Sequence, residues 1–354
     1  MSSFSAFDHA MMRRALELAV KGMYTTTPNP RVGCVVTRGE SVIGEGWHER
    51  AGSPHAEVLA LRGVDAAGAT VYVNLEPCNH QGRTPPCVPL LVQAKVARVV
   101  AAMRDPNRDA AGGGEVLAAA GIRFEHGLLE DEARELNIGF VSRVTRGRPW
   151  VRMKIAATLD GRTALADGRS QWITGAEARR DGHRWRARAS AILTGIGTVR
   201  ADDPQLTVRE VQTPRQPLRV IIDSRLETPR EARILRGERV LVFAGRDGAL
   251  PNAEVVALPN PQGKVDLPRM LEVLAERGVN ELHVEAGFRL NGSLVREGCV
   301  DEFVVYLNPS LLGDGAQGMV DLPLPGALDE RLRLRVLSLE RLGDDLRLLA
   351  RPAA

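Results

Sequence analysis

The chain has 354 residues, of which 44% are hydrophobic and 26% are charged, and its formal net charge at pH 7 is +3. This length and apolar content allow two folded domains, each with its own core. The small net charge and an aromatic content of 4% argue against a channel that stacks single-stranded nucleic acid. No apolar run approaches the length of a bilayer-spanning helix. We therefore expect a protein whose partners are neither nucleic acid nor membrane.

An amphipathic helix opens the chain. The apolar residues of 7–19 recur at helical spacing and are interrupted by charges, which is not the pattern of a signal sequence. A proline-containing loop at 27–30 follows. Two short apolar stretches, 32–37 and 41–47, then flank a polar turn and predict a β-hairpin.

The rest of the first half alternates helices with strands. Such alternation predicts an α/β sandwich whose functional site lies at the strand ends. The expected elements are a helix that begins at Ser53-Pro54 and carries His55 and Glu57, a strand at 70–75, a helix near 88–94 and a strand at 97–102. Cys78 follows the first of these strands, and Cys87 precedes the second helix, where the helix dipole favours thiolate over thiol.

His55, Cys78 and Cys87 together supply one imidazole and two thiolates. Zinc favours this three-ligand set when its fourth position stays open for water. Zinc lowers the pKa of such a water from about 15.7 to near 7. Glu57 lies two residues after the histidine, where it can move protons between the water, a ring nitrogen and the leaving amine. These are the parts needed for hydrolytic deamination of an amino-substituted pyrimidine or purine ring.

Other interpretations of this motif stay open on the residues alone. A closed structural zinc site would need a fourth ligand, for which His80 is the candidate, and the chain would then be a binding protein. A deaminase acting on nucleic acid would share the ligands, but the low aromatic content argues against it. Eight residues separate Cys78 from Cys87, whereas two separate the cysteines in the commoner deaminase signature.

Cysteine usage indicates the compartment. The chain has four cysteines, and two of them belong to the metal motif. Cys34 lies in the apolar run 32–36, where core packing is the expected role. So few cysteines, two of them needed as thiolates, indicate a reducing cytoplasm.

The second half restarts the alternation of strands and helices. A segment without apolar periodicity at 143–149 is the expected linker, which gives domains at 1–145 and 149–354. No Gly-x-Gly-x-x-Gly follows a strand, so the standard dinucleotide fingerprint is absent. The junction at Ala286-Gly287 offers free backbone N–H groups that suit a phosphate, although most such junctions are simple turns. We expect strands at 150–156, 189–194, 218–223, 239–244, 281–285 and 302–307, and helices at 176–187, 267–276 and 290–297.

Motifs in both halves match those of one known family, in the expected order. In the first half they are PNPRVGCV at 28–35, GEGWH at 44–48 and EPCNHQGRTPPC at 76–87. In the second half they are KIAATLDGR at 154–162, SQWIT at 170–174, GTVRADDPQLTVR at 197–209, VIIDS at 220–224 and VEAG at 284–287. Together they resemble the bifunctional deaminase/reductase family of riboflavin biosynthesis over nearly the whole chain.

The resemblance implies a fold, two cofactors and two reactions. It implies an N-terminal cytidine-deaminase-like three-layer α/β/α domain and a C-terminal dihydrofolate-reductase-like α/β domain. The first would use Zn²⁺ to convert 2,5-diamino-6-ribosylamino-4(3H)-pyrimidinone 5′-phosphate to 5-amino-6-(5-phosphoribosylamino)uracil. The second would use NADPH to reduce the ribosyl group to ribityl. A homo-oligomer joined through the reductase domain is also implied, and either half alone could be the active one.

The resemblance further implies roles for single residues. Glu57 would be catalytic in deamination, and Asp202 and Lys154 would be the polar groups nearest the hydride-accepting carbon, either of which could be the proton donor. Asn29, His48 and His80 would contact the pyrimidine, with Arg83 on its phosphate. Contacts to the ribosyl substrate would come from Ser170, Arg186, Leu206, Arg209 and Glu285. The NADPH cleft would be lined by Ala156, Trp172, Thr198, Asp202, Ser224, Gly287, Phe288, Arg289, Leu290, Asn291, Gly292 and Ser293.

Two features near the expected cofactor site are particular to this chain. Phe288-Arg289 occupies a place where the family often has a small residue or proline, and Arg289 could assist a phosphate there. Arg219 and Arg225 lie near Ser224 and favour a cofactor that carries a 2′-phosphate. NADPH is the cofactor that the resemblance implies, and the residues by themselves leave the choice between NADPH and NADH open.

Overall fold

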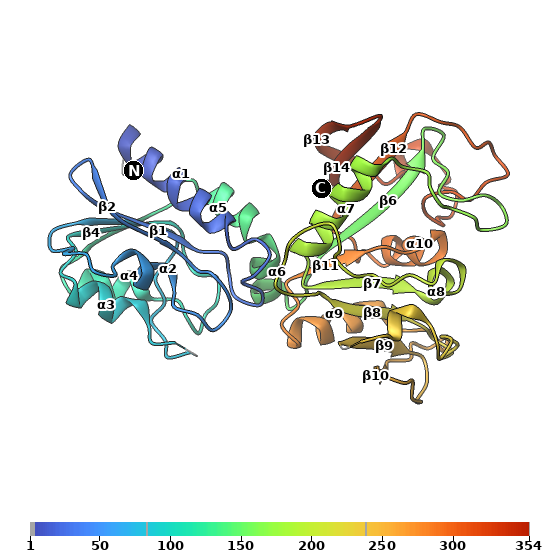
Figure 1. The fold of residues 1–354 in the computed structure, drawn as a ribbon, viewed down its shortest axis with the longest axis horizontal. Helices are drawn as coiled ribbons and strands as arrows, with labels where there is room; N and C mark the ends of the chain where they lie inside the picture. Colours follow the sequence, from blue (N-terminus) through green and yellow to red (C-terminus); the bar gives the residue numbers. More distant parts are fainter. Residues whose placement is uncertain (1–3, 83, 238, 354) are drawn as a thin grey trace. The chain divides into compact units, whose positions relative to one another are not determined.

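The chain divides into two compact units, residues 1–147 and 148–354 (Figure 1). The structure is a computed structural model, and it describes residues 4–82, 84–237 and 239–353. Arg83, which is predicted to hold the substrate phosphate, lies outside the described residues. Within the described ranges, no helix combines the length and the apolar character needed to cross a membrane.

The first unit is built on a five-stranded sheet in the order β2-β1-β3-β4-β5. β1 runs antiparallel to β2 and to β3, whereas β3, β4 and β5 are mutually parallel. The predicted hairpin and the two predicted strands that follow it are confirmed. The strands are β1 Gly33–Arg38, β2 Ser41–Trp47, β3 Thr70–Leu75, β4 Arg98–Met103 and β5 Arg123–His126.

Successive residues of the central strands face opposite sides of this sheet. Val71 and Val73 of β3 belong to a core covered by α2, α3 and α4, whereas Tyr72 belongs to a core covered by α1 and α5. The sheet is therefore buried on both faces, and the predicted three-layer α/β/α arrangement is confirmed (Figure 1). The helices are α1 Ala6–Val20, α2 Ala56–Ala60, α3 Cys87–Gln93, α4 Gly113–Ala119, α5 Glu130–Leu136 and α6 Ile138–Arg146.

The predicted linker at 143–149 is wrong over its first residues. α6 continues to Arg146 and is ended by Gly147, whose φ of +67° lies in the left-handed region that glycine adopts without strain. Phe140, in the first turn of α6, is buried and packs the helix against the domain. The polar last turn of the helix extends from this packed part. The polar composition of 143–146 therefore marks an exposed helix end.

The second unit contains a nine-stranded sheet in the order β10-β9-β8-β7-β11-β6-β12-β14-β13. The seven strands from β10 to β12 in this order are parallel, and β14 and β13 add an antiparallel edge. β11 lies between β6 and β7, which come earlier in the chain (Figure 1). The strands are β6 Trp150–Thr158, β7 Ala191–Gly195, β8 Leu218–Ile222, β9 Val240–Ala244, β10 Glu254–Ala257, β11 Glu281–Val284, β12 Glu302–Asn308, β13 Leu334–Leu342 and β14 Asp345–Pro352.

The parallel part of this sheet is also buried on both faces. Leu193 of β7 and Val220 of β8 pack in a core with α9 and α10, whereas their neighbours Ile192 and Ile221 pack on the opposite face with α8. All six strands and all three helices predicted for this half are present. The helices are α7 Ala176–Arg188, α8 Ile196–Asp202, α9 Leu267–Glu276 and α10 Phe288–Arg296.

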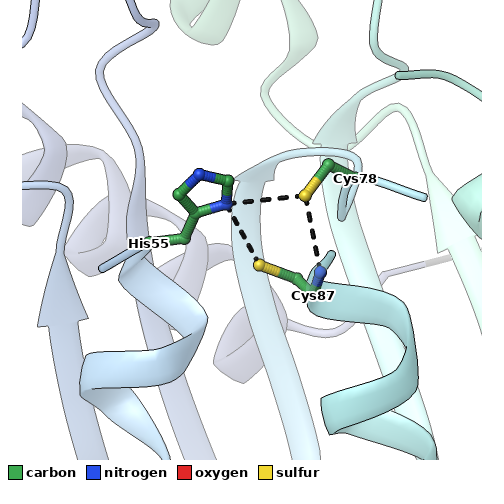
Figure 2. Close-up of side chains that lie close together, drawn as sticks. All are labelled: His55, Cys78 and Cys87. Carbon is green, nitrogen blue, oxygen red and sulfur yellow. Dashed lines mark hydrogen bonds between the residues drawn. The ribbon is translucent and has the colours of Figure 1, made fainter. Parts of the chain in front are cut away.

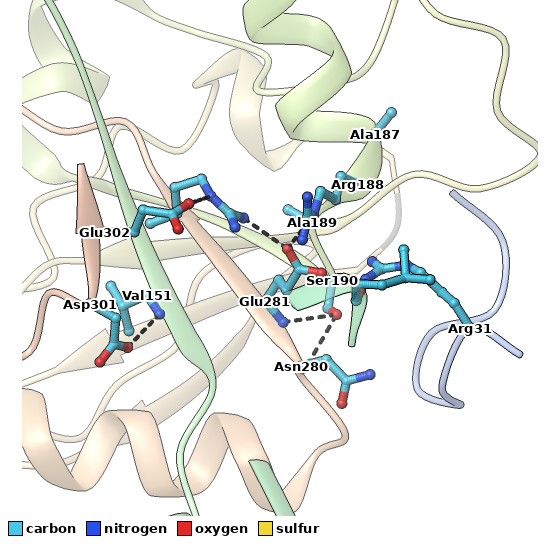
Figure 3. Close-up of polar contacts among 12 residues, drawn as sticks. Arg31, Val151, Ala187, Arg188, Ala189, Ser190, Asn280, Glu281, Asp301 and Glu302 are labelled. Carbon is cyan, nitrogen blue, oxygen red and sulfur yellow. Dashed lines mark hydrogen bonds and ion pairs between the residues drawn. The ribbon is translucent and has the colours of Figure 1, made fainter. Parts of the chain in front are cut away.

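A buried network of opposite charges joins the amino ends of three parallel strands to two other elements. Arg152 of β6 pairs with Glu281 of β11 at 2.8 Å and with Glu302 of β12. Arg188 of α7 reaches Glu281 at 2.7 Å (Figure 3). Arg351 of β14 reaches Glu302 at 2.8 Å. Burial alone would raise the pKa of Glu302, but the guanidinium of Arg152 lowers it, so the carboxyl is charged at neutral pH.

We expect Glu302→Gln to destabilise the second unit by about 3–5 kcal/mol, because it breaks a buried network of ion pairs. Arg152 then keeps Glu281, which it shares with Arg188, and Arg351 loses its ion pair with Glu302. Urea unfolding followed by tryptophan fluorescence measures this, since the Trp185 ring lies 4.5 Å from the guanidinium of Arg152. Glu340→Gln is the matched control, because Glu340 pairs with Arg347 from an exposed position and should change stability little. Equal stability of the two variants would contradict the role given to the network.

Candidate functional site

Three chain segments of the first unit bring the predicted metal ligands together. His55 is the N-cap residue of α2, Cys78 follows β3 at its carboxyl end, and Cys87 is the first residue of α3. The prediction that α2 begins at Ser53-Pro54 is wrong by two residues. At the N-cap, His55 has an extended backbone with φ −71° and ψ 164°, which places it outside the helix, while Glu57 is in the first turn.

The ligand atoms of these three residues converge. His55 Nδ1 lies 3.2 Å from Cys87 Sγ and 3.5 Å from Cys78 Sγ, and all three ligand atoms lie within 4.8 Å of one another (Figure 2). His80, the candidate fourth ligand of a closed structural site, is exposed and does not belong to this group. Three ligands of the N, S, S type, with no fourth among the residues that the structure describes, fit a zinc ion with an open position.

Electrostatics in the group favour a thiolate beside a proton carrier. The pKa of Cys78 is lowered to about 4, because its sulfur accepts hydrogen bonds from the Cys87 thiol, from His55 and from the Cys87 backbone N–H. The pKa of Cys87 is raised by that same hydrogen bond and by burial. The Glu57 side chain is buried, with 3% of the residue exposed. Its pKa is raised mainly by this burial and further by the negative charge of the nearby Cys78 thiolate. A carboxyl of raised pKa beside a metal site can both take up and release a proton.

The two predicted pyrimidine contacts that lie upstream are hydrogen-bonded to each other. Asn29 Nδ2 lies 3.1 Å from His48 Nε2, and His48 Nδ1 lies 3.2 Å from the Pro54 carbonyl oxygen. Since the carbonyl can only accept, His48 Nδ1 carries the proton and Nε2 accepts from Asn29. The His48 ring stands edge-on to the His55 ring, with the centroids 5.5 Å apart. Asn29 and His48 therefore lie beside the metal-ligand group.

Glu76, just before Cys78, holds the strand-end loops together. Its buried carboxylate accepts backbone hydrogen bonds from Asp105 N at 3.0 Å and Gly114 N at 2.8 Å. Gly113 approaches so closely that a Cβ there would lie 2.0 Å from the Pro77 carbonyl oxygen. The sequence analysis did not single out these positions, although a glutamate directly after a buried strand is the signal that could have found the first of them.

In the second unit, the predicted catalytic residues lie near the carboxyl ends of β7 and β11 and the middle of β6. β6 and β11 pair in parallel with Met153 opposite Val284, so the next residues, Lys154 and Glu285, lie on adjacent strands at the same height. Asp202 ends α8, and its carboxylate accepts a 3.4 Å hydrogen bond from Ser170 Oγ. Burial lowers the pKa of Lys154, and burial raises the pKa of Asp202.

The irregular segment 206–209 is held by side chains instead of a neighbouring strand. Arg186 donates to the Thr207 carbonyl at 3.1 Å and forms a two-bond ion pair with Glu285, whose pKa burial would raise but the arginine holds well below its ordinary value. His183 Nδ1 accepts from the backbone N–H of Arg209 at 3.3 Å, and burial lowers the pKa of His183 to about 4. Gln216 bonds both the N–H and the carbonyl of Val208, at 2.8 and 3.1 Å. His183 and Gln216 are positions that the sequence analysis missed.

Two helix N-termini lie side by side at the ends of β7 and β11, which are neighbouring parallel strands. Gly195 is the N-cap of α8 and Gly287 is the N-cap of α10. A Cβ on Gly195 would lie 2.9 Å from Leu290, so α10 packs directly against this turn, while a Cβ on Gly197 would meet open space. Paired helix N-termini with little side-chain cover fit the diphosphate of a dinucleotide cofactor.

The other residues predicted to line the cofactor cleft differ in what their side chains do. Ser224 accepts from Val265 N, Asn291 donates to the Met319 carbonyl, and Ser293 donates to the Arg289 carbonyl. Gly292 packs against the backbone of Asp321, and the side chains of Leu290 and Leu206 pack in hydrophobic cores. Phe288 and Ala156 are half-buried, Arg289 and Trp172 are exposed, and Thr198 lies close to Gly287.

The expected pair of arginines for a 2′-phosphate is brought together only in part. Arg219 is buried and donates to the carbonyls of Ile234 and Arg236, both at 2.8 Å. Burial also lowers the pKa of Arg219. The prediction that Arg219 serves the cofactor is therefore wrong, because its guanidinium is turned into the fold. Arg225 is exposed.

Known proteins match both halves of the chain. The family model for the RibD C-terminal domain matches residues 149–348, and the model for the cytidine and deoxycytidylate deaminase zinc-binding region matches residues 5–103. Riboflavin biosynthesis protein RibD of Escherichia coli is 44% identical, over 96% of this chain and 98% of the relative. The chain belongs to the RibD family.

Relatives and solved structures of this family agree over nearly the full length. RibD of Aquifex aeolicus is 42% identical over 96% of this chain and 97% of the relative. The structure of Acinetobacter baumannii RibD superposes with a TM-score of 0.91 at 42% identity, covering 98% of this chain and 99% of that one. A Thermotoga maritima deaminase/reductase superposes with a TM-score of 0.89 at 34% identity, covering 98% and 99%.

Family membership confirms the predicted enzyme class and fold. The protein is a bifunctional enzyme of riboflavin biosynthesis, with a zinc-dependent deaminase domain followed by an NADPH-dependent reductase domain. The cytidine-deaminase-like and reductase folds predicted for the two halves are confirmed by the same matches. A structural zinc site in a non-enzymatic protein is thereby excluded.

We expect Cys87→Ser to lose its zinc on purification, because a neutral hydroxyl replaces a thiolate ligand. Elemental analysis of the purified protein by mass spectrometry measures this. Cys34→Ala is the matched control: Cys34 is a fully buried core residue whose pKa is raised by burial, and this variant should keep its zinc. Full zinc content in Cys87→Ser would contradict the assignment of the ligands.

Proposed function

We propose that His55, Cys78 and Cys87 hold the zinc ion and that Glu57 moves the protons of the deamination. Bound zinc supplies an activated water at neutral pH and polarises the reacting centre. The single observation that carries this proposal is the convergence of three ligand atoms next to a buried carboxyl of raised pKa. Glu57 would take the two protons of the attacking water one after the other, giving the first to the ring nitrogen and the second to the departing amine, which leaves as ammonia.

Asn29 and His48 are proposed to orient the pyrimidine. The hydrogen bond from Asn29 Nδ2 to His48 Nε2 fixes the orientation of the Asn29 side-chain amide, and with it the direction of the amide oxygen. Such an oxygen accepts a hydrogen bond from a ring amine or N–H, which selects an amino-substituted ring. His80 and Arg83 belong to the loop between the two cysteines, and we assign them the remaining substrate contacts, with Arg83 on the phosphate.

The substrate would be 2,5-diamino-6-ribosylamino-4(3H)-pyrimidinone 5′-phosphate, and the product of deamination would pass to the reductase domain. This proposal agrees with the activity of the Thermotoga maritima relative, which is a diaminohydroxyphosphoribosylaminopyrimidine deaminase and 5-amino-6-(5-phosphoribosylamino)uracil reductase. NADPH supplies a hydride to C1 of the ribosyl group when it is bound. As the bond between C1 and the ring oxygen breaks, the ring oxygen needs a proton.

Lys154 is the proposed proton donor. Burial lowers the pKa of its ammonium, which makes it a stronger acid than a solvated lysine. Asp202 receives a hydrogen bond from Ser170, so the two form a polar pair suited to orienting a ribosyl hydroxyl. Glu285 is held as a carboxylate by Arg186 and lies next to Lys154 on the neighbouring strand. These residues therefore bind, orient and protonate the sugar.

Arg209 and Arg186 are proposed to surround the phosphate of the ribosyl substrate. Arg209 is exposed and bonds to Gln205 and Thr207 on its own segment, so its remaining donors can reach a phosphate. Arg186 is engaged with Glu285 and with the Thr207 carbonyl, so it fixes this segment as well. Leu206 would contact substrate through its backbone, since its side chain is buried.

The N-termini of α8 and α10 are proposed to hold the cofactor diphosphate. Thr198, Gly287, Phe288 and Arg289 lie at or next to these N-termini, and the packing of Leu290, Asn291, Gly292 and Ser293 keeps α10 in place. Ala156 and Trp172 would contact the nicotinamide end. Ser224, with the exposed Arg225 beside it, would lie at the adenosine end.

A homo-oligomer formed through the reductase domain is also proposed. β13 is the edge strand of the nine-stranded sheet, and Leu334, Val336 and Leu339 on it are between 40% and 59% exposed. An exposed apolar edge strand is costly in a monomer and suits a second copy of the same chain. A reducing cytoplasm is the proposed location, because the thiolate ligands must stay unoxidised.

We expect Glu57→Gln to lower deamination by at least about 100-fold while zinc content is retained, since an amide cannot transfer the protons. Mass spectrometry of the diaminopyrimidinone ribosylamine phosphate, incubated with and without NADPH, measures both reactions together. The variant should still reduce the aminouracil when that compound is supplied directly. Glu49→Gln, at an exposed position of the same domain, is the control and should deaminate normally. Unimpaired deamination by Glu57→Gln would refute the role of Glu57.

We expect kcat/KM for the reduction to fall on the alkaline side, with an apparent pKa below the ordinary value of a lysine, because burial lowers the pKa of Lys154. Lys154→Arg keeps the positive charge but gives up no proton in this range, so the variant should be slow and lack this alkaline fall. Asp202→Asn should be slower than wild type but should still show the fall of kcat/KM at alkaline pH. The measurement is kcat/KM for the reduction, from steady-state kinetics across pH. An alkaline fall that is still present in Lys154→Arg would assign the proton to another group.

A further inference from the structure

The ring of His55 has two nitrogens, and the structure gives each a different partner. Nδ1 faces the sulfurs of Cys78 and Cys87, at 3.5 and 3.2 Å. Nε2, on the other side of the ring, lies 2.9 Å from Thr84 Oγ1. A nitrogen that binds a metal must present its lone pair, so the ring proton is then on the other nitrogen. The Thr84 hydroxyl is therefore the acceptor for the Nε2–H.

We propose that Thr84 is a positioning residue of the deaminase, which fixes the tautomer and the ring orientation of His55 for metal binding. Histidines that bind metals usually donate their second ring N–H to a carboxylate, a carbonyl or water. Here a hydroxyl from the loop between the two cysteines takes that place. The inference rests on the proposed assignment of His55, Cys78 and Cys87 as the zinc ligands.

The chain around Thr84 makes this contact well defined. Pro85 and Pro86 separate Thr84 from Cys87, and each proline restricts its own φ to near −65°. Pro86 is the N-cap of α3, with φ −64° and ψ 149°, so this stiff segment leads directly into the helix that begins with Cys87. The hydroxyl and the second cysteine are thus delivered by one short segment of restricted backbone.

The base of the loop is closed by the metal-ligand residues themselves. The backbone N–H groups of Cys87 and Val88 both donate to the Cys78 carbonyl, at 3.2 and 3.3 Å. The two cysteines are therefore held together by backbone hydrogen bonds, while Thr84 connects their loop to the histidine on α2. The eight residues between the two cysteines consequently serve the metal site as well as the proposed substrate contacts. They form a loop long enough to place Thr84 at Nε2, the nitrogen of the His55 ring that faces away from the two sulfurs.

The test is the zinc affinity of the full-length protein, measured by competition with a chromogenic chelator. Thr84→Val keeps the shape of the side chain and removes the hydroxyl, and we expect its zinc dissociation constant to rise about 10–100-fold. Thr84→Ser keeps the hydroxyl and should retain the wild-type affinity. Thr145→Val, at an exposed position of α6 whose hydroxyl donates to the Val141 carbonyl, is the control for a threonine-to-valine change and should also be unaffected.

A second measurement reports the tautomer directly. In protein labelled with ¹⁵N-histidine and loaded with zinc, we expect a slowly exchanging His55 Nε2–H signal in the wild type and in Thr84→Ser, and its loss in Thr84→Val. Equal zinc affinity in wild type and Thr84→Val would overturn the inference, as would a loss in Thr84→Ser as large as that in Thr84→Val. If the wild type itself bound no zinc, the proposed ligands would be wrong and the inference would fall with them.

Discussion

Each of the two sheets is buried on both faces over its central parallel strands, and this constraint decides where polar side chains can lie. Val71 and Tyr72, neighbours on β3, enter different cores, and Ile192 and Leu193 do the same on β7. A strand buried in this way has no solvated face, so charged and metal-binding groups collect at the strand ends and at the helix N-termini beside them. Both of the proposed sites lie near such ends.

In the deaminase domain, the site depends on backbone hydrogen bonds as much as on its ligands. The Cys78 carbonyl and the Glu76 carboxylate accept four backbone N–H bonds between them, from Cys87, Val88, Asp105 and Gly114. These bonds bring the ends of β3 and β4 and the starts of α3 and α4 together. A metal site assembled from distant segments needs this support, because three free side chains would lose conformational entropy on binding an ion.

In the reductase domain, the order of strands in the sheet creates the site. β11 enters the sheet between β6 and β7, which places Lys154 beside Glu285 and the N-terminus of α10 beside that of α8. The charge network of Arg152, Glu281 and Glu302 lies at the opposite, amino ends of β6, β11 and β12. Strand register is thus fixed at the amino ends by buried ion pairs, and the residues proposed to act on the substrate follow further along the same strands or directly after them.

The sequence by itself determined the enzyme class and much of the alternation of elements, and it predicted the three residues that we propose as zinc ligands, because apolar periodicity and ligand chemistry are local properties of the chain. It did not reveal α4, β5, α5, α6, α8, β10, β13 or β14, most of which are short or exposed and leave little periodic signal. The predicted linker at 143–149 overlaps the last turn of α6 and contains the boundary between the two units. Nor did it single out Glu76, Thr84, His183 or Gln216. Their roles depend on partners such as Asp105, His55 and Arg209, and for the first three the partner is between 26 and 29 residues away along the chain. Only the tertiary structure decided those contacts, since pairing between distant segments follows from packing and strand order, which no local pattern encodes.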